Sequence, residues 1–304
     1  MPQIKANGLA IEFESFGRES DPAILLIMGY TGQLTMWPVA LCEGLAAQGF
    51  RVIRFDNRDV GKTTHLSHLG LPNMADVMTK FVARQKIDTA PYRLDDMASD
   101  AVGLLDALGI ARAHIVGASM GGMIAQLVAA RHGTKARSLT SIMSTTGKPG
   151  LPAAKPEAMA AITTPPASNS REDRIAAGRR TWRTIGSPGY PATDAELDAL
   201  LAREVDRVPY DPAGLARQLV AIVSAEPRHE ILANVRCPAL VIHGADDPLV
   251  PVEGGKDTAA SIPGARLVIV PGMAHDFTQA LVPVFLGHIG DFVSGVEAQA
   301  KAAE

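Results

Sequence analysis

A serine flanked by glycines has the clearest potential for covalent chemistry in this sequence. The segment Gly117–Gly121 reads Gly-Ala-Ser-Met-Gly, with the apolar run His114–Val116 before it and a helix-like run, Met123–Arg131, after it. In such a strand–turn–helix context the serine is exposed as a nucleophile, and small residues are needed because a Cβ two positions away would clash. The pattern therefore predicts that Ser119 is a nucleophile. The alternative is a structural serine in a glycine-rich turn.

A serine hydroxyl needs a histidine base, and eight histidines compete for that role. Catalytic groups of parallel α/β sheets lie on loops just beyond the carboxyl ends of strands. His275 meets this condition, because it ends the segment Pro271–His275 that follows the apolar run Arg266–Val270. Other histidines fall within or at the ends of predicted strands, in helical stretches or near a predicted boundary: His114, His243, His132, His288 and His229. We therefore assign the base to His275.

The acid that orients the base is expected after the apolar run Ala239–Ile242, where Asp246 and Asp247 are neighbours. Neighbouring side chains in an extended segment point to opposite sides, so only one of the two can reach His275. Pro248 restricts the residue before it to extended conformations and so fixes the direction of the Asp247 side chain. We therefore favour Asp247 as the acid, with Asp246 as a solvated or turn-capping residue.

Acyl transfer also needs hydrogen-bond donors for the developing oxyanion. One donor is expected to be the backbone N–H of Met120, directly after the nucleophile. The other is expected from the loop Met28–Gly32, which follows the apolar run Ile24–Met28, and we assign it to the backbone N–H of Tyr30. A plain turn is the alternative for this loop.

Short apolar runs alternate with helical patterns along most of the chain. The runs are Ile24–Met28, Arg51–Phe55, His114–Val116, Leu139–Met143, Ala239–Ile242 and Arg266–Val270. They are continuous rather than alternating, which favours a parallel sheet covered on both faces. The period of the apolar residues predicts a helix within Tyr92–Ile110, and the Asn7-Gly8 turn predicts an N-terminal antiparallel hairpin. We therefore expect a doubly wound, mostly parallel α/β sheet.

The strand pattern is interrupted from 148 to 225, where proline, alanine and charged residues dominate. Helical periodicity returns around Arg174–Ile185 and Glu196–Asp206. We expect an α/β core made of residues 1–147 and 226–304, with residues 148–225 inserted as a helical lid. The lid should shape the acyl or alcohol pocket without supplying a catalytic group.

Composition disfavours several other classes of protein. The 29 Lys and Arg residues against 32 Asp and Glu residues give a net charge of −3, and aromatic residues make up only 5% of the chain, so nucleic-acid binding is not expected. The first twenty residues lack the apolar region of a signal peptide, and the apolar runs are too short to span a bilayer. We expect a cytoplasmic protein without a membrane span.

Metal and nucleotide motifs are also weak. The two cysteines, Cys42 and Cys237, form no Cys-x-x-Cys pair, and no third ligand accompanies the neighbouring histidines His65 and His68. Gly61-Lys62-Thr63 imitates the end of a phosphate-binding loop, but Asp56 stands where that motif requires glycine. We therefore expect no metal and no other cofactor.

Taken together, the motifs resemble those of the α/β-hydrolase superfamily over essentially the full chain. The segments MGYTGQLTMWP, RFDNRDVGKT, LLDALGI, HIVGASMGG, GADDPLVP and PGMAH are similar to bacterial carboxylesterases of the aclacinomycin methylesterase type. The order Ser119, Asp247, His275 is also that of α/β-hydrolases. The resemblance implies a lid-bearing core, a Ser/Asp/His triad and no cofactor. Many relatives carry His-Gly where this chain has Met28-Gly29.

The expected function is that of a serine ester hydrolase acting on a small-molecule ester. Ser119 would be acylated, and His275 would activate the water that hydrolyses the acyl-enzyme. Haloalkane dehalogenases and epoxide hydrolases are disfavoured. Those relatives carry Asp where this chain has Ser119 in the tight turn from strand to helix, the nucleophile elbow. The alternatives are perhydrolysis, thioester cleavage or C–C bond hydrolysis on the same triad. An alternative of a different class is a hydrolase-fold binding protein with little turnover.

Overall fold

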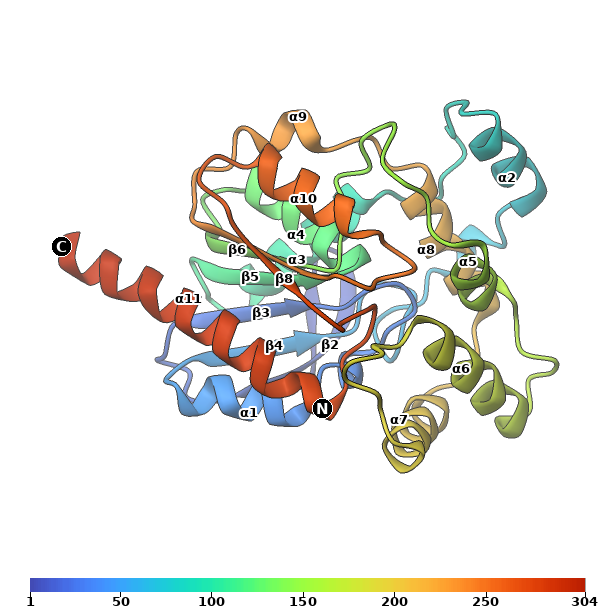
Figure 1. Ribbon diagram of the computed structural model, residues 1–304, viewed down its shortest axis with the longest axis horizontal. Coiled ribbons are helices and arrows are strands. Elements are labelled where there is room, and N and C mark those ends of the chain that lie inside the picture. The colour runs from blue at the N-terminus through green and yellow to red at the C-terminus, as the bar shows by residue number, and fades with distance from the viewer. Residues whose placement is uncertain (304) are drawn as a thin grey trace.

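Eight strands form one sheet in the order β1-β2-β4-β3-β5-β6-β7-β8 in the computed structural model, which describes residues 1–303 (Figure 1). The strands are β1 Gln3–Ala6, β2 Leu9–Phe16, β3 Ala23–Ile27, β4 Arg51–Phe55, β5 Ala113–Ala118, β6 Ala136–Ile142, β7 Ala239–Gly244 and β8 Arg266–Val270. All neighbours from β4 to β8 are parallel, whereas β1 and β2 add an antiparallel edge. The prediction of a doubly wound, mostly parallel sheet is confirmed.

The N-terminal hairpin follows from its turn residues. Asn7 and Gly8 both have positive φ, 47° and 78°, as a two-residue hairpin turn requires. This turn fixes the register in which Ile4 pairs with Ile11. The predicted antiparallel hairpin is therefore present.

The central strands of the sheet are buried on both faces, as their continuous apolar runs predict, whereas the edge strand β8 is only partly buried because it has a neighbour on one side alone. Leu25 and Ile27 of β3 pack on the face covered by α3 (Leu94–Ala107) and α4 (Met120–Arg131). Ile24 and Leu26 point to the opposite face, which α1 (Val39–Ala47) and α11 (Val282–Ala303) cover. Alternate side chains of one strand thus contribute to two hydrophobic cores, one on each face of the sheet.

The C-terminal helix is the one described element long and apolar enough, by length and composition, to cross a membrane. A helix from the core of a globular domain passes the same test. Phe285, Ile289 and Val293 of α11 are buried against the sheet and α1, and the end of the helix projects beyond the core (Figure 1).

Residues 148–225 contain four helices and no strand. They are α5 Pro156–Thr163, α6 Arg171–Ile185, α7 Asp194–Arg207 and α8 Pro212–Val223, and we call them the β6–β7 helices. They lie beyond the carboxyl ends of the strands (Figure 1). The helix α2 (Met74–Val82), which precedes these helices in the chain, packs on α8 through Val77 and Val220.

The remaining helices are short connectors on the core. They are η1 Leu34–Met36, η2 Ser67–Leu69, α9 His229–Leu232, α10 Val252–Ser261 and η3 Gln279–Leu281. Of these, α10 packs against β7 and β8, the two strands that precede the predicted acid and base.

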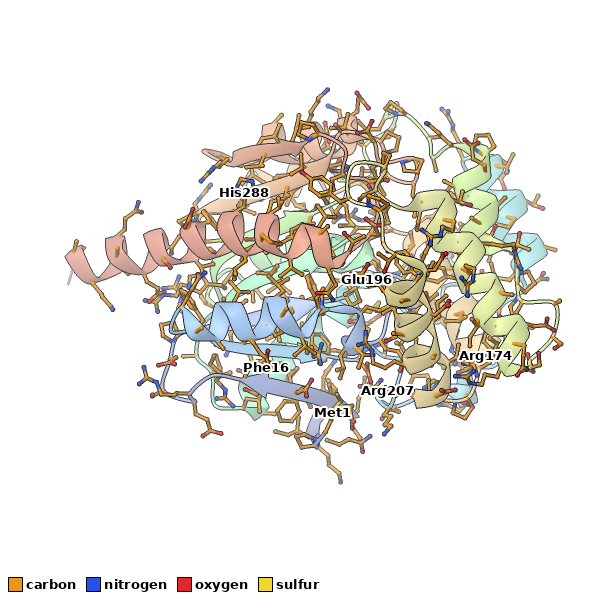
Figure 2. The ribbon with its side chains drawn as sticks, turned by 60° about the horizontal axis from the view of Figure 1, so that its bottom comes forward. Met1, Phe16, Arg174, Glu196, Arg207 and His288 are labelled. Atoms are coloured by element: carbon orange, nitrogen blue, oxygen red, sulfur yellow. The ribbon has the colours of Figure 1, made fainter. Side chains whose placement is uncertain are left out.

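Polar contacts attach α7 to the core. The Arg207 guanidinium, at the end of α7 nearest the N-terminus in Figure 2, lies 2.7 Å from the buried Asp56 carboxylate and donates to Gln33 Oε1 at 2.6 Å. Gln33 in turn donates to the Glu204 carbonyl at 2.7 Å. A buried charge pair of this kind is costly to break, since one uncompensated charge would remain. It therefore fixes where α7 sits on the core.

Candidate active site

Ser119 lies on a strained turn between β5 and α4. Its backbone has φ 55° and ψ −120°, a conformation that non-glycine residues rarely adopt. A Cβ on Gly117 would lie 2.0 Å from the Gly121 carbonyl oxygen, and one on Gly121 would lie 2.0 Å from the Ile27 carbonyl oxygen. Glycine is therefore required at both positions. The turn places Ser119 at the carboxyl end of the central strand, where the residue is partly exposed.

Three predicted site residues come together in one hydrogen-bonded chain. The Ser119 Oγ lies 2.9 Å from His275 Nε2, and His275 Nδ1 lies 2.7 Å from Asp247 Oδ2. His275 and Asp247 are both buried, at 6% exposure each. Because the Nδ1 side faces a carboxylate, Nδ1 carries a proton, and Nε2 is left to accept the hydrogen bond of the serine hydroxyl.

The two adjacent aspartates have different surroundings. Asp247 Oδ1 accepts hydrogen bonds from the backbone N–H groups of Leu249 and Val250, which leaves Oδ2 directed at His275. Asp246 is exposed, and its Oδ2 accepts from the Gly272 backbone N–H at 2.8 Å. Asp246 therefore ties together the loops after β7 and β8, and Asp247 alone contacts the imidazole.

The loop after β3 passes close to Ser119. A Cβ on Gly29 would lie 3.0 Å from the Ser119 Cβ, so the loop has no room for a larger residue there. Met120 is the first residue of α4, and the first N–H groups of a helix have no partner within it. Tyr30 follows Gly29 in this loop, and burial raises the pKa of its phenol to about 12, so its side chain stays neutral. Gly29, the residue before Tyr30, thus lies against the serine, and Met120 follows the serine directly in the chain.

Two side chains that the sequence analysis left unassigned hold this loop. Asn57 Nδ2 donates to the Met28 carbonyl at 2.9 Å, and Gln218 Oε1 of α8 accepts from the Thr31 N–H at 3.1 Å. Gln218 also donates to the Arg58 carbonyl. Asn57 could have been found from its place just beyond the carboxyl end of β4. Gln218 gives no such signal, because it lies in the middle of a helix.

No third ligand was expected beside the pair His65 and His68, and the structure shows a different group, which contains His65 without His68. Asp59 and Asp211 lie with His65 in this group, whose ligand atoms are all within 4.8 Å of one another. Asp211 gives no sequence signal beside His65, because the two residues are far apart in the chain. A guanidinium already balances these acids, however, since Arg217 lies 2.8 Å from Asp59 and 3.7 Å from Asp211. The group is therefore an ion-pair cluster that joins α8 to the loop after β4.

The Gly61-Lys62-Thr63 motif also has a structural explanation. Gly61 has φ 62°, and a Cβ there would lie 2.0 Å from Asp56 Oδ2. The Lys62 N–H donates to the same oxygen at 2.9 Å. The motif is thus a turn wrapped around a buried carboxylate, which is the opposite of a phosphate-binding loop.

A cavity of about 620 Å³ lies beside the histidine loop. The β6–β7 helices line one side, including Trp182, Leu197 and Leu200, and Met36, Asp276 and Phe277 belong to the other side. Ser119 and His275 are absent from its described lining.

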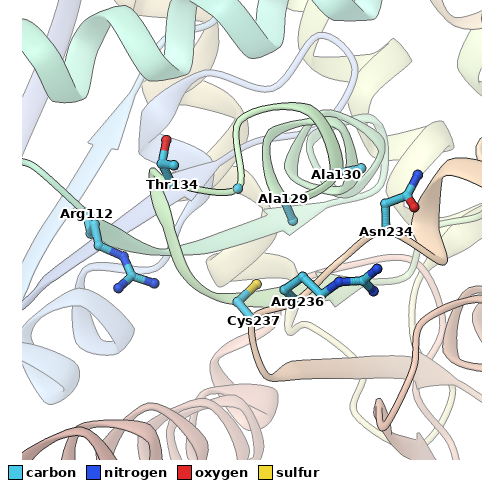
Figure 3. Close-up of a pocket in the computed structure, with 8 residues that line it drawn as sticks. Arg112, Ala129, Ala130, Thr134, Asn234, Arg236 and Cys237 are labelled. Carbon is cyan, nitrogen blue, oxygen red and sulfur yellow. The ribbon is translucent and has the colours of Figure 1, made fainter.

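A second cavity, of about 480 Å³, surrounds Cys237 together with Arg112 and Thr134 (Figure 3). Those residues precede β5, β6 and β7, so this cavity is at the amino ends of the strands. It is therefore at the opposite end of the sheet from Ser119.

The comparisons with known proteins agree with this architecture. A family model described as the alpha/beta hydrolase fold matches residues 22–278, so the chain belongs to the α/β hydrolase fold family, and its predicted class is confirmed.

Among curated proteins it is similar to the rhodomycin D methylesterase DauP of Streptomyces sp. (strain C5), with 27% identity over 86% of this chain and 87% of that protein. It is also similar to 3-oxoadipate enol-lactonase 2 of Acinetobacter baylyi, with 26% identity over 83% of this chain and 82% of that protein. A solved structure, the enol-lactonase from Burkholderia xenovorans LB400, matches with a TM-score of 0.71 and 24% identity, covering 96% of this chain and 100% of that one. The prediction that the protein is a hydrolase of the esterase class is therefore confirmed.

Proposed function

We propose that the protein hydrolyses carboxylic esters through an acyl-enzyme on Ser119. The observation that carries the proposal is the continuous chain from Ser119 Oγ through His275 to Asp247, with contacts of 2.9 and 2.7 Å. A hydroxyl becomes an effective nucleophile only when a positioned base takes its proton, and this chain supplies one.

The mechanism assigns one role to each group. Ser119 Oγ attacks the ester carbonyl carbon while His275 Nε2 takes the hydroxyl proton, and Asp247 stabilises the resulting imidazolium. The oxyanion accepts hydrogen bonds from the backbone N–H groups of Tyr30 and Met120. The intermediate collapses, the alcohol leaves with the proton from His275, and the acyl group stays on Ser119. Water then attacks the acyl-enzyme by the same steps, which releases the acid and restores the serine.

Residues 148–225 act in this proposal as a lid over the site. Support comes from the cavity of about 620 Å³, which α6 and α7 line together with the two residues that directly follow His275. The cavity lies next to His275, so it could receive part of a bound substrate. Ser119 is not in its lining, so that part would be remote from the scissile bond. The methylesterase and enol-lactonase similarities favour a small-molecule ester or lactone as the substrate.

A substrate panel combined with active-site labelling tests the proposal. Wild type and Ser119→Ala are assayed on p-nitrophenyl esters of increasing acyl length, on methyl esters and on lactones. Both proteins are also exposed to a fluorophosphonate. We expect turnover and one adduct per chain for wild type, and neither for Ser119→Ala. Neither turnover nor adduct in the wild type would instead identify a hydrolase-fold binding protein.

A further inference from the structure

Several hydrogen bonds attach the histidine loop to the segment Ile185–Ser187 at the end of α6. The His275 N–H donates to the Ile185 carbonyl, the last residue of α6, at 2.9 Å. Before it, the Ala274 N–H donates to Ser187 Oγ at 2.7 Å. After it, the Asp276 carboxylate accepts from Ser187 twice, from the N–H at 3.0 Å and from the hydroxyl. Three consecutive residues, centred on His275, are thus held by one turn of the chain.

Close backbone packing continues this attachment. The Gly189 N–H donates to the Gly272 carbonyl at 2.9 Å, and a Cβ on Gly189 would lie 2.8 Å from the Gly272 Cα. Ser187 and Asp276 are buried, at 2% and 7% exposure. Burial raises the pKa of the Asp276 carboxyl, and the hydrogen bonds from Ser187 oppose that shift. A buried carboxylate that lost these donors would be strongly destabilised, so the pair is held in one arrangement.

We propose that Ser187 and Asp276 are positioning residues, which fix the backbone of His275 so that its Nε2 faces Ser119. The inference rests on the proposed function, because it gives His275 the part of base. Ser187 Oγ accepts from the residue before His275 and donates to the residue after it, so the hydroxyl clamps both sides of the histidine. No other described side chain contacts both flanks in this way.

The consequence is a link between the β6–β7 helices and the chemistry. Ser187 lies just after α6, whereas the elbow that carries Ser119 belongs to β5 and α4. The distance between nucleophile and base therefore depends on how the α6–α7 segment sits on the core. A misplacement of about 1 Å at a reacting group costs about 10²-fold in rate.

The test compares Ser187→Ala and Asp276→Asn with a matched control, Thr184→Ala. Thr184 is exposed at the end of α6 and hydrogen-bonds only to the Arg180 carbonyl within its own helix. We expect kcat on a small ester to fall about 10- to 100-fold in both test variants, with KM changed by less than about threefold, because the lost alignment is used in the transition state. Thr184→Ala should keep the wild-type kcat.

A second measurement separates positioning from simple stability. The proton resonance of the Nδ1–H between His275 and Asp247 should shift or broaden in both test variants and not in Thr184→Ala. Asp276→Asn conserves volume and provides the test should Ser187→Ala not fold. Wild-type kcat and an unchanged resonance, with only a lower melting temperature, would overturn the inference. Retained activity of Ser119→Ala would instead overturn the proposed function.

Discussion

The serine and histidine sides of the site are built in different ways. Ser119 is held by its own neighbours, because Gly117 and Gly121 allow the turn and β5 and α4 surround it. The His275 backbone N–H is bonded to Ile185 and the residues on both sides of it are bonded to Ser187, about ninety positions earlier in the chain. The position of the proposed nucleophile therefore depends on neighbouring residues in the sequence, whereas the proposed base is held by contacts with a distant segment. Substitutions on the Ser119 side and on the His275 side should therefore reduce activity for different reasons.

Ser119→Ala is expected to have the largest effect. Removing the hydroxyl deletes the nucleophile but only a small volume, so kcat should fall by at least about 10⁵-fold while the melting temperature stays within a few degrees. Ester turnover and thermal unfolding measured on the same preparation check this. Activity within tenfold of wild type would place the nucleophile elsewhere.

Asp247→Asn is expected to rank second. The amide cannot replace the carboxylate that faces His275 Nδ1, so kcat should fall by up to about 10⁴-fold. Asp246→Asn serves as the matched comparison and should cost at most about tenfold, because the Asp246 side chain accepts a hydrogen bond only from the Gly272 N–H. Both variants are measured on one ester at saturating concentration. The reverse ranking would transfer the role of the acid to Asp246.

Substitutions in the cavity lining should change the preference among ester substrates more than the rate of the chemical step. Trp182→Ala and Leu200→Ala remove apolar contacts from the cavity lining, and the ratio of kcat/KM between a long-chain and an acetate ester should change by about tenfold. Met159→Ala, on an exposed part of α5, is the control and should leave the ratio unchanged. If kcat/KM fell by the same factor on every ester, these helices would contribute to stability and not to substrate selection.

The two sides also differ in what the sequence could predict. The elbow was predictable because its glycines and serine lie within five consecutive residues that follow a recognisable strand. The sheet was predictable from continuous apolar runs. The part played by Ser187 was not, since nothing near it signals that its hydroxyl meets Ala274 and Asp276. For the same reason Asp211 was missed as a neighbour of His65. Contacts between distant segments depend on the packed fold, and single-sequence patterns do not contain them.

The smallest expected effect concerns the ion pair between His65 and Asp211, 2.6 Å apart. Burial lowers the pKa of His65, but acceptors at both ring nitrogens, Asp211 and the Gly61 carbonyl, outweigh burial and raise it overall. Burial raises the pKa of Asp211, and hydrogen bonds from Gly214 and His65 more than reverse this.

The stabilisation from His65 is thus fully present below the unfolded histidine pKa of about 6.5 and is lost as pH rises through the higher folded value. His65→Gln should lower the melting temperature more at pH 5.5 than at pH 8.5, by about 1–2 °C, since the pair is partly exposed. Differential scanning calorimetry of both proteins at the two pH values measures this. An equal loss at both would show that the imidazolium contributes nothing.

Peptide-level mass spectrometry after fluorophosphonate labelling tests the acyl-enzyme mechanism most directly. We predict one adduct per chain in the wild type, located on the peptide that contains Ser119, with loss of ester turnover in proportion to labelling. Asp247→Asn should label at the same position but far more slowly, because activation of the serine depends on His275. An adduct on a different residue, or full ester turnover by a protein completely labelled at Ser119, would contradict the mechanism.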